Sequence, residues 1–275
     1  MENRYTWKTF LRGAAMMALV ILWITPLYYP IMISFKTTKE AYQNILALPT
    51  QLNFNNYAIA WNRGSLGRAL LNTAVITGCT VVLLIIFGSM CAYTIARKRT
   101  RRWNMVYMLF VVGTIMPYKL GLLPTYVVFN RARLTGTFPG IILLQIGIQI
   151  PMTVFLYTGF TRSISTSFDE AAQIDGASPL QTFLYVIFPL MKPVTSTVAI
   201  QTGIAVWNEF FMSLIFLGGS KKIPLSVSLY NYIGDNATQW NLVFASVVIS
   251  LIPVVICFLL LQKNMIKGFA GGIKA

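Results

Sequence analysis

Long hydrophobic runs separated by short polar segments dominate the pattern of this chain. A helix that crosses a bilayer needs about 20 mostly apolar residues. Stretches of this kind predict spanning helices over residues 14–34, 69–96, 104–129, 139–160, 194–217 and 241–261. The first run is too long for the apolar core of a signal peptide, and no small-x-small cleavage site follows it. We therefore expect an all-α integral membrane protein with six transmembrane helices, forming one transmembrane domain over residues 1–275.

Composition supports the membrane class. Only 11% of the residues are charged and 56% are hydrophobic, whereas a soluble domain carries about 25% charged residues. The net charge of +15 does not indicate nucleic-acid binding, because the cations lie in short clusters between apolar runs rather than on one basic face.

The distribution of Lys and Arg predicts the orientation. The segment RKRTRR, residues 97–102, places five cations in a short loop between predicted spans two and three. Such loops stay on the cytoplasmic side. Both termini and the segment between spans four and five, called here the 161–193 loop, are then cytoplasmic, and the segments 35–68 and 218–240 face outward.

The sequence lacks the residues that several kinds of chemistry require. The chain has no His, and its three cysteines, Cys79, Cys91 and Cys257, lie inside apolar runs without a CxxC spacing. This pattern disfavours a metal site or a disulfide framework. No G-x-x-x-x-G-K-[ST] segment is present, so the chain is not expected to hydrolyse ATP or to act as an enzyme.

The 161–193 loop differs from its apolar surroundings, because it holds three of the seven acidic residues. Residues 165–167 offer hydroxyl N-caps for a first short helix. Gly176 allows a left-handed turn after Asp175, and Ser178-Pro179 predicts the start of a second helix. The sequence therefore predicts a helix, a turn and another helix.

The second helix of the loop is amphipathic. Leu180, Phe183, Leu184 and Ile187 follow one another at helical spacing and predict one apolar face. An interfacial helix on anionic lipid is usually rich in Lys and Arg, whereas this loop is acidic. A protein partner is therefore the favoured interpretation, and a lipid surface is the alternative.

The stretch EAAQIDGASPLQTFLYVIFPLMKP resembles the EAA loop of permease subunits of binding-protein-dependent ABC importers, and the second permease subunit of maltose-type sugar importers in particular. The matching positions are Glu170, Ala171, Ala172, Asp175, Gly176, Ala177, Ser178, Phe183, Pro189 and Pro193. WNEF at residues 207–210 and the C-terminal KGFAGGIKA also match. The family usually has Pro where this chain has Ser165.

The resemblance implies a type I ABC importer permease in the bacterial cytoplasmic membrane. Its implied partners are a second permease subunit in a heterodimer, two ATPase subunits and an external solute-binding protein that delivers a carbohydrate, an oligosaccharide by family. ATP and Mg²⁺ would be held by the ATPase subunits, and this chain would bind no cofactor.

The resemblance also implies roles in coupling to the ATPase. In this family the second helix of the loop docks into a cleft of the ATPase, whose closure around ATP turns the permease from inward-facing to outward-facing. Transferred to this chain, the coupling residues are Glu170, Ala171, Ala172, Asp175, Gly176, Ser178, Leu180, Phe183 and Leu184. The alternative is that Ala171, Ala172 and Gly176 only pack the loop against the permease itself.

Two charged residues fall inside predicted spans, where charges are costly and usually functional. Lys119 and Glu209 lie at a similar predicted depth in spans three and five. They are expected to pair or to face one water-filled cavity, and Lys119 could instead reach an anionic group of the substrate. Glu209 could also brace helix packing together with Asn208.

Gln145, Gln149 and Thr153 form a polar stripe along span four. They are candidates for the substrate pathway together with Lys119, Asn208 and Glu209, or they hydrogen-bond neighbouring helices. Pro117 and Pro124 are expected to bend or interrupt span three.

Two other classes of protein remain open. A proton-driven secondary transporter would use Glu209 as the proton carrier, but it leaves the 161–193 loop unexplained. A membrane scaffold without transport leaves Lys119 and Glu209 unexplained. Within the ABC class, a permease for a non-sugar or anionic solute is a further alternative.

Overall fold

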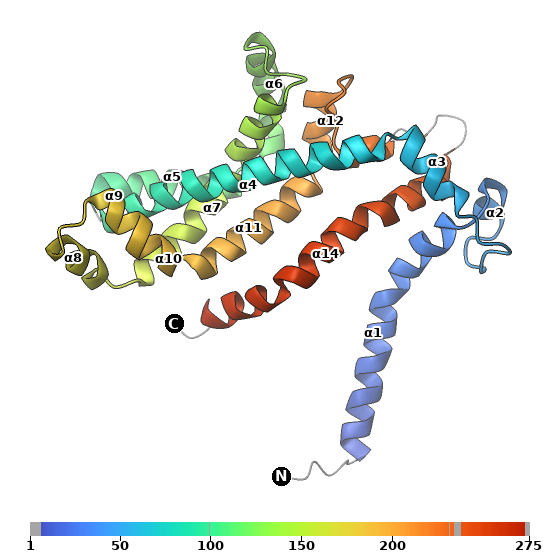
Figure 1. Ribbon diagram of the computed structural model, residues 1–275, viewed down its shortest axis with the longest axis horizontal. Coiled ribbons are helices and arrows are strands. Elements are labelled where there is room, and N and C mark those ends of the chain that lie inside the picture. The colour runs from blue at the N-terminus through green and yellow to red at the C-terminus, as the bar shows by residue number, and fades with distance from the viewer. Residues whose placement is uncertain (1–6, 99, 231, 234–237, 273–275) are drawn as a thin grey trace. The chain divides into compact units, whose positions relative to one another are not determined.

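The computed structural model describes residues 7–98, 100–230, 232–233 and 238–272 (Figure 1). Every regular element in this part of the chain is a helix. The helices form two compact units: unit 1 comprises residues up to Gly67 together with Ser228–Val255, and unit 2 comprises Arg68–Val227 and the residues from Ile256 onward. Arg99 of the basic cluster and the last three residues of KGFAGGIKA lie outside the described residues.

Unit 1 contains α1 (Trp7–Ser34), α2 (Thr38–Gln43), α3 (Asn55–Arg63) and the first half of α14 (Trp240–Gly272). A buried amide joins three of these helices. Asn56 donates to the carbonyl oxygens of Ser34 and Lys36 (2.8 Å each) and accepts a hydrogen bond from Asn241 (3.0 Å). These hydrogen bonds offset the cost of burying the Asn56 amide.

The segment between α1 and α3 is also held by charged side chains. Lys36 is fully buried, and its Nζ donates to the carbonyl oxygens of Asn44 and Ile45. Glu40 accepts a hydrogen bond from the Thr50 N–H (2.7 Å), and this hydrogen bond lowers the pKa of the Glu40 carboxyl below its ordinary value. The predicted outward-facing segment 35–68 thus has a defined backbone path.

Unit 2 is built around α4 (Leu66–Arg97), α7 (Phe138–Ser163) and α11 (Lys192–Trp207), which run side by side in Figure 1. α4 and α7 cross closely, since a Cβ atom at Gly88 would stand 2.5 Å from Thr153 Cγ2. The core beside this crossing is formed by Ala92, Ile95, Val154, Tyr157, Phe183, Ile187, Met191, Val194 and Val198.

Three helices are long and apolar enough to cross a membrane: Thr9–Ser34, Leu66–Arg97 and Phe138–Ser163. They correspond to predicted spans one, two and four. Two bent helix pairs would raise the number to five, and α14 contributes a shorter apolar stretch, Trp240–Ile256. The described helices therefore support the predicted membrane class, with three to five candidate spans rather than six.

Predicted span three, over residues 104–129, is interrupted as expected. α5 (Arg101–Ile115) ends before Pro117, a 3₁₀ turn η1 (Tyr118–Gly121) follows, and α6 (Leu122–Arg131) leaves at a bend of 91°. Met116 is extended, with ψ 127°, as expected for the residue before a proline. The prediction that Pro117 interrupts this span is confirmed.

Predicted span five, over residues 194–217, is also divided. α11 ends at Trp207, and α12 (Phe211–Leu217) starts after a break of three residues. A second bend, of 76°, separates Pro179–Leu190 from α11. Asn208 and Glu209 occupy the break, where their side chains form hydrogen bonds with backbone groups. α13 (Leu225–Tyr230) is the remaining short helix before α14.

Candidate functional site

The first helix of the 161–193 loop forms as its sequence predicts. α8 (Ser167–Ile174) has Thr166 at its N-cap and Asp169 and Glu170 in its first turn, where the helix dipole favours anions. The capping differs in detail, because Thr166 makes no side-chain capping bond and Ser165 Oγ instead accepts from the Ser167 N–H (3.2 Å). The chain turns at Gly176, whose φ is +81°, so the predicted left-handed turn is confirmed.

The second helix begins with reciprocal capping. Ser178 N–H donates to Gln181 Oε1 (2.8 Å), and Gln181 N–H donates to Ser178 Oγ (3.4 Å). Pro179 is the first residue of α9 (Pro179–Gln181), as predicted. A π-helical turn, η2 (Thr182–Ile187), and α10 (Phe188–Leu190) continue this second helix. Sequence periodicity did not predict the π-helical turn.

The four apolar residues of the second helix do not share one exposed face. The prediction that Phe183 contacts a partner is therefore wrong. Phe183 is only 4% exposed and Ile187 is fully buried, while Leu180 and Leu184 are 55% and 45% exposed. The Phe183 ring packs against Tyr93 of α4, with centroids 5.3 Å apart. Phe183 therefore belongs to the core of unit 2 and is not available to a partner.

Two residues that the sequence did not single out hold α8 in place. Arg97, at the end of α4, forms an ion pair with Asp169 (2.7 Å between Nη2 and Oδ2) and donates from Nη1 to the Ile164 carbonyl (3.0 Å). Tyr93 donates to the other oxygen of Asp169 (2.6 Å). The three contacts join the ends of α4 and α7 to α8. The sequence signal for this contact is Arg97 itself, which stands in the basic cluster RKRTRR, whose charges predict only the orientation of the chain.

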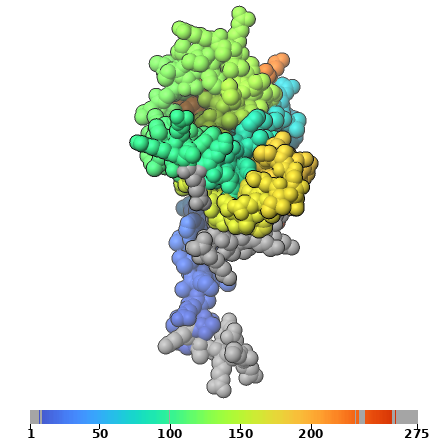
Figure 2. All heavy atoms as spheres, turned by 90° about the vertical axis from the view of Figure 1, so that its left-hand side faces the viewer, coloured from blue at the N-terminus to red at the C-terminus, as the bar shows by residue number. Residues whose placement is uncertain are grey.

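All but one of the other proposed coupling residues lie at the surface of unit 2. Glu170, Ala171, Asp175, Gly176 and Ser178 are exposed, and Ala172 is buried. In Figure 2 the segment containing them, coloured yellow to gold, forms part of the surface that faces the viewer. Large exposed apolar side chains surround them: Phe168, Ile174, Leu180, Leu184 and Tyr185. An exposed apolar patch of this kind marks an interaction surface.

Lys119 and Glu209 do not form an ion pair, although both approach the start of α12. Glu209 accepts hydrogen bonds from the backbone N–H groups of Met212 and Ser213 (2.9 Å each) and from Ser213 Oγ (3.1 Å). Lys119 Nζ lies 5.5 Å from the centroid of the Phe211 ring. Pairing, one of the predicted arrangements, is therefore wrong, and Glu209 acts as an N-terminal cap of α12.

The residues of the polar stripe of α7 differ in their exposure. Gln145 and Thr153 are 1% and 2% exposed, whereas Gln149 is half-buried. Thr153 packs against Gly88 in the α4–α7 crossing. Neither polar atom of the Gln145 amide has a hydrogen-bond partner within the described part of the chain. Asn208 is exposed and donates to the Ile204 carbonyl (2.9 Å).

A cavity of about 380 Å³ lies among α6, α7 and α12. Its lining is mainly apolar, with the Tyr118 and Thr125 hydroxyls as polar groups. Lys119, Gln145, Gln149 and Glu209 are not among its lining residues. Across the described residues, no group of three His, Cys, Asp or Glu side chains could hold a metal ion.

Residues 84–270 match the family described as the inner membrane component of binding-protein-dependent transport systems. The chain belongs to this family. It is therefore a permease subunit of an ABC importer and not an enzyme, as predicted. Membership also favours the ABC importer over a proton-driven secondary transporter or a scaffold without transport.

Similar proteins of this family match over almost the whole chain. The melibiose/raffinose/stachyose import permease protein MelC of Bacillus subtilis is 37% identical over 248 residues, covering 90% of each chain. The multiple sugar-binding transport system permease protein MsmG of Streptococcus mutans is 34% identical and covers 92% of each.

Solved structures agree on the fold. A chain of the bacterial ABC transporter that imports the acidic polysaccharide alginate matches with a TM-score of 0.78 over 94% of this chain and 98% of that one, at 24% identity. The permease architecture is thereby established as the type I ABC importer fold.

Proposed function

We propose that this chain is a membrane-spanning subunit of an ATP-driven importer for a carbohydrate, an oligosaccharide by class. The names of its relatives support this proposal, because MelC imports melibiose, raffinose and stachyose and MsmG serves a multiple sugar-binding system. The likeness extends over nine tenths of the chain, so it includes the spans as well as the 161–193 loop.

The proposed assembly contains a second permease subunit, two ATPase subunits that hold ATP and Mg²⁺, and an external solute-binding protein. A structural neighbour of 18% identity and TM-score 0.67 is described in complex with an alginate pentasaccharide-bound periplasmic protein. That neighbour supports the expectation of a solute-binding partner. Coupling to separate ATPases fits the absence of a phosphate-binding loop from this chain.

We place the whole chain as one permease domain in the bacterial cytoplasmic membrane, with both termini and the 161–193 loop in the cytoplasm. The six spans would comprise the three long helices, the bent pair around Pro117, α11 together with α12, and α14. Interrupted helices are common near the central sites of transporters.

The observation that carries the coupling proposal is the surface of the 161–193 loop. Its inner side is fixed to α4 through Asp169 and Phe183, and its outer side presents Leu180 and Leu184 to solvent. A rigidly held element with exposed apolar side chains is suited to transmit a displacement from an ATPase to α4 and α7. Glu170 and Asp175 would add charge contacts at the rim, and Gly176 and Ser178 would set the angle of the second helix.

We assign to the substrate pathway those polar candidates whose side chains are exposed or half-buried. Gln149 and Asn208 would contact sugar hydroxyls, and Lys119 would lie beside the route near Phe211. Gln145, Thr153 and Glu209 would instead stabilise the helices that form the route, because their side chains are buried or bonded to a helix terminus.

A double substitution tests the coupling surface. Leu180→Asp with Leu184→Asp should lower both the ATPase activity that co-purifies with the tagged permease and sugar uptake by at least about tenfold, since buried apolar anchors dominate protein interfaces. The matched control is Leu46→Asp with Leu48→Asp, two leucines that are 67% and 68% exposed in unit 1. Retained ATPase activity in the first variant would refute the coupling proposal.

A further inference from the structure

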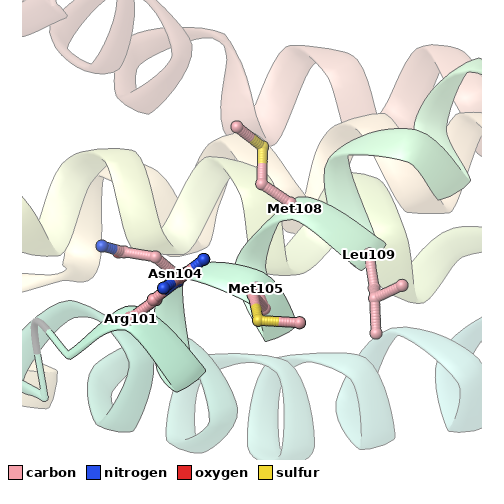
Figure 3. Close-up of a pocket in the computed structure, with 5 residues that line it drawn as sticks. All are labelled: Arg101, Asn104, Met105, Met108 and Leu109. Atoms are coloured by element: carbon pink, nitrogen blue, oxygen red, sulfur yellow. The ribbon is translucent and has the colours of Figure 1, made fainter.

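A groove on unit 2 combines cations with an apolar floor. It has a volume of about 620 Å³ and is lined by Arg101, Asn104, Met105, Met108 and Leu109 of α5. Figure 3 shows the two polar residues together at one end of the groove and the apolar residues along the following turns. The groove lies at the end of α5 that follows the basic cluster of residues 97–102.

A second cation reaches the polar end from α7. Arg162 donates from Nη2 to Asn104 Oδ1 (3.4 Å), and its guanidinium carbon lies 4.5 Å from the centroid of the Tyr107 ring. These contacts orient Arg162 toward α5. In the described part of the chain, neither Arg101 nor Arg162 has a carboxylate within ion-pair distance, because the ion pair present joins Arg97 to Asp169. Arg101 lines the groove and Arg162 bonds to Asn104, which also lines it, so two cations without a carboxylate partner in the described residues border this end of the groove.

The apolar part of the groove continues along α5. Met105, Met108 and Leu109 are 64%, 61% and 72% exposed, and Val112 and Ile115, at 53% and 78%, extend the stripe. From Arg101 to Ile115 the helix rises by roughly 21 Å, at about 1.5 Å per residue. This length exceeds the roughly 15 Å of hydrocarbon in one leaflet, half the thickness of a bilayer core.

We propose that this groove binds one anionic phospholipid molecule. Its phosphate and headgroup would lie against Arg101, Arg162 and Asn104, and one acyl chain would lie along Met105, Met108 and Leu109. Basic pockets between membrane helices on the cytoplasmic side bind anionic headgroups in this manner. The apolar stripe favours a lipid over a free phosphate ion, because a soluble anion would not use it. This inference rests on the proposed membrane orientation, with the basic end of α5 in the cytoplasm.

Lipid retention by the intact transporter tests the site. The complex is reconstituted with phosphatidylglycerol and phosphatidylcholine, purified in mild detergent, and its bound lipids are counted by native mass spectrometry. Arg101→Gln and Arg162→Gln should each lower the retained phosphatidylglycerol about fivefold, which corresponds to about 1 kcal/mol per cation near a lipid headgroup. Arg102→Gln is the matched control, because Arg102 is exposed on the same turn and does not line the groove.

Three other outcomes of these experiments would overturn the inference. Equal losses in the Arg102→Gln variant would indicate unspecific attraction, and displacement of the lipid by inorganic phosphate would indicate a soluble ligand. A disulfide cross-link from Met105→Cys to the second permease subunit would show that a protein covers the groove. Because retention is measured without ATP or sugar, a negative result leaves the proposed transport function intact, and a failure of ATP coupling leaves the lipid result intact.

Discussion

Unit 2 satisfies two of its carboxylates, Asp169 and Glu209, in different ways. At one end, Asp169 depends on Arg97 and Tyr93, which lie more than seventy positions earlier in the chain. At the start of α12, Glu209 uses backbone N–H groups only three and four residues ahead. The first arrangement fixes one element to another, whereas the second stabilises a single helix. Loss of a long-range partner should therefore damage the protein more than loss of a local cap.

The largest effect is expected from Asp169→Ala. The substitution leaves the guanidinium of Arg97, only 13% exposed, without its counter-charge, and breaking a buried pair costs about 3–5 kcal/mol. The midpoint of thermal unfolding of the purified transporter should fall accordingly. Asp175→Ala, at an exposed position of the same loop, should change the midpoint little. Equal effects of the two variants would contradict the anchoring role of Asp169.

A smaller effect is expected from Gly176→Ala. A residue with a Cβ atom at φ +81° costs about 1–2 kcal/mol, and the second helix of the loop should lose its orientation. We expect reduced uptake together with a lower unfolding midpoint. Gly159→Ala is the control, because Gly159 is helical and a Cβ atom there meets nothing within 4 Å. An unaffected Gly176→Ala variant would show that the turn is not needed.

Glu209→Ala should cost about 1 kcal/mol, the usual loss when an N-terminal cap is removed. The Met212 and Ser213 N–H groups bond to different carboxylate oxygens of Glu209. Glu209→Gln keeps one of these two acceptors, so it should lose less stability than Glu209→Ala and should retain ATP-driven uptake. Uptake assays of both variants separate a cap from a proton carrier. Complete loss of uptake in Glu209→Gln, with normal folding, would contradict the cap and favour proton chemistry.

The smallest effect is expected from Lys119→Met. An exposed cation near an aromatic ring contributes about 0.5–1 kcal/mol, and Lys119→Arg should preserve this contact with Phe211. Uptake of a neutral sugar should stay within about twofold in both variants, which corresponds to less than 0.5 kcal/mol. A strong loss for Lys119→Met alone, seen with an acidic sugar, would instead assign Lys119 to substrate recognition.

Much of the fold was predictable because membrane helices are specified by local composition. The long apolar runs, the break at Pro117, the turn at Gly176 and the capping of α9 by Ser178 all depend on residues close together in the sequence. The division of span five at Asn208 was not predicted, since a short polar break in an apolar run is compatible with a continuous helix. The π-helical turn over Thr182–Ile187 was missed for the same reason.

The sequence by itself determined that this protein is an all-helical membrane permease with an acidic helix–turn–helix between two spans. Hydrophobic length, proline, glycine and capping residues act over a few positions, so their effect can be read locally. The tertiary structure decided which face of that loop is free: Phe183 turns into the core against Tyr93, and Asp169 finds Arg97. Burial depends on what packs against a residue, and helical periodicity alone does not specify that neighbour.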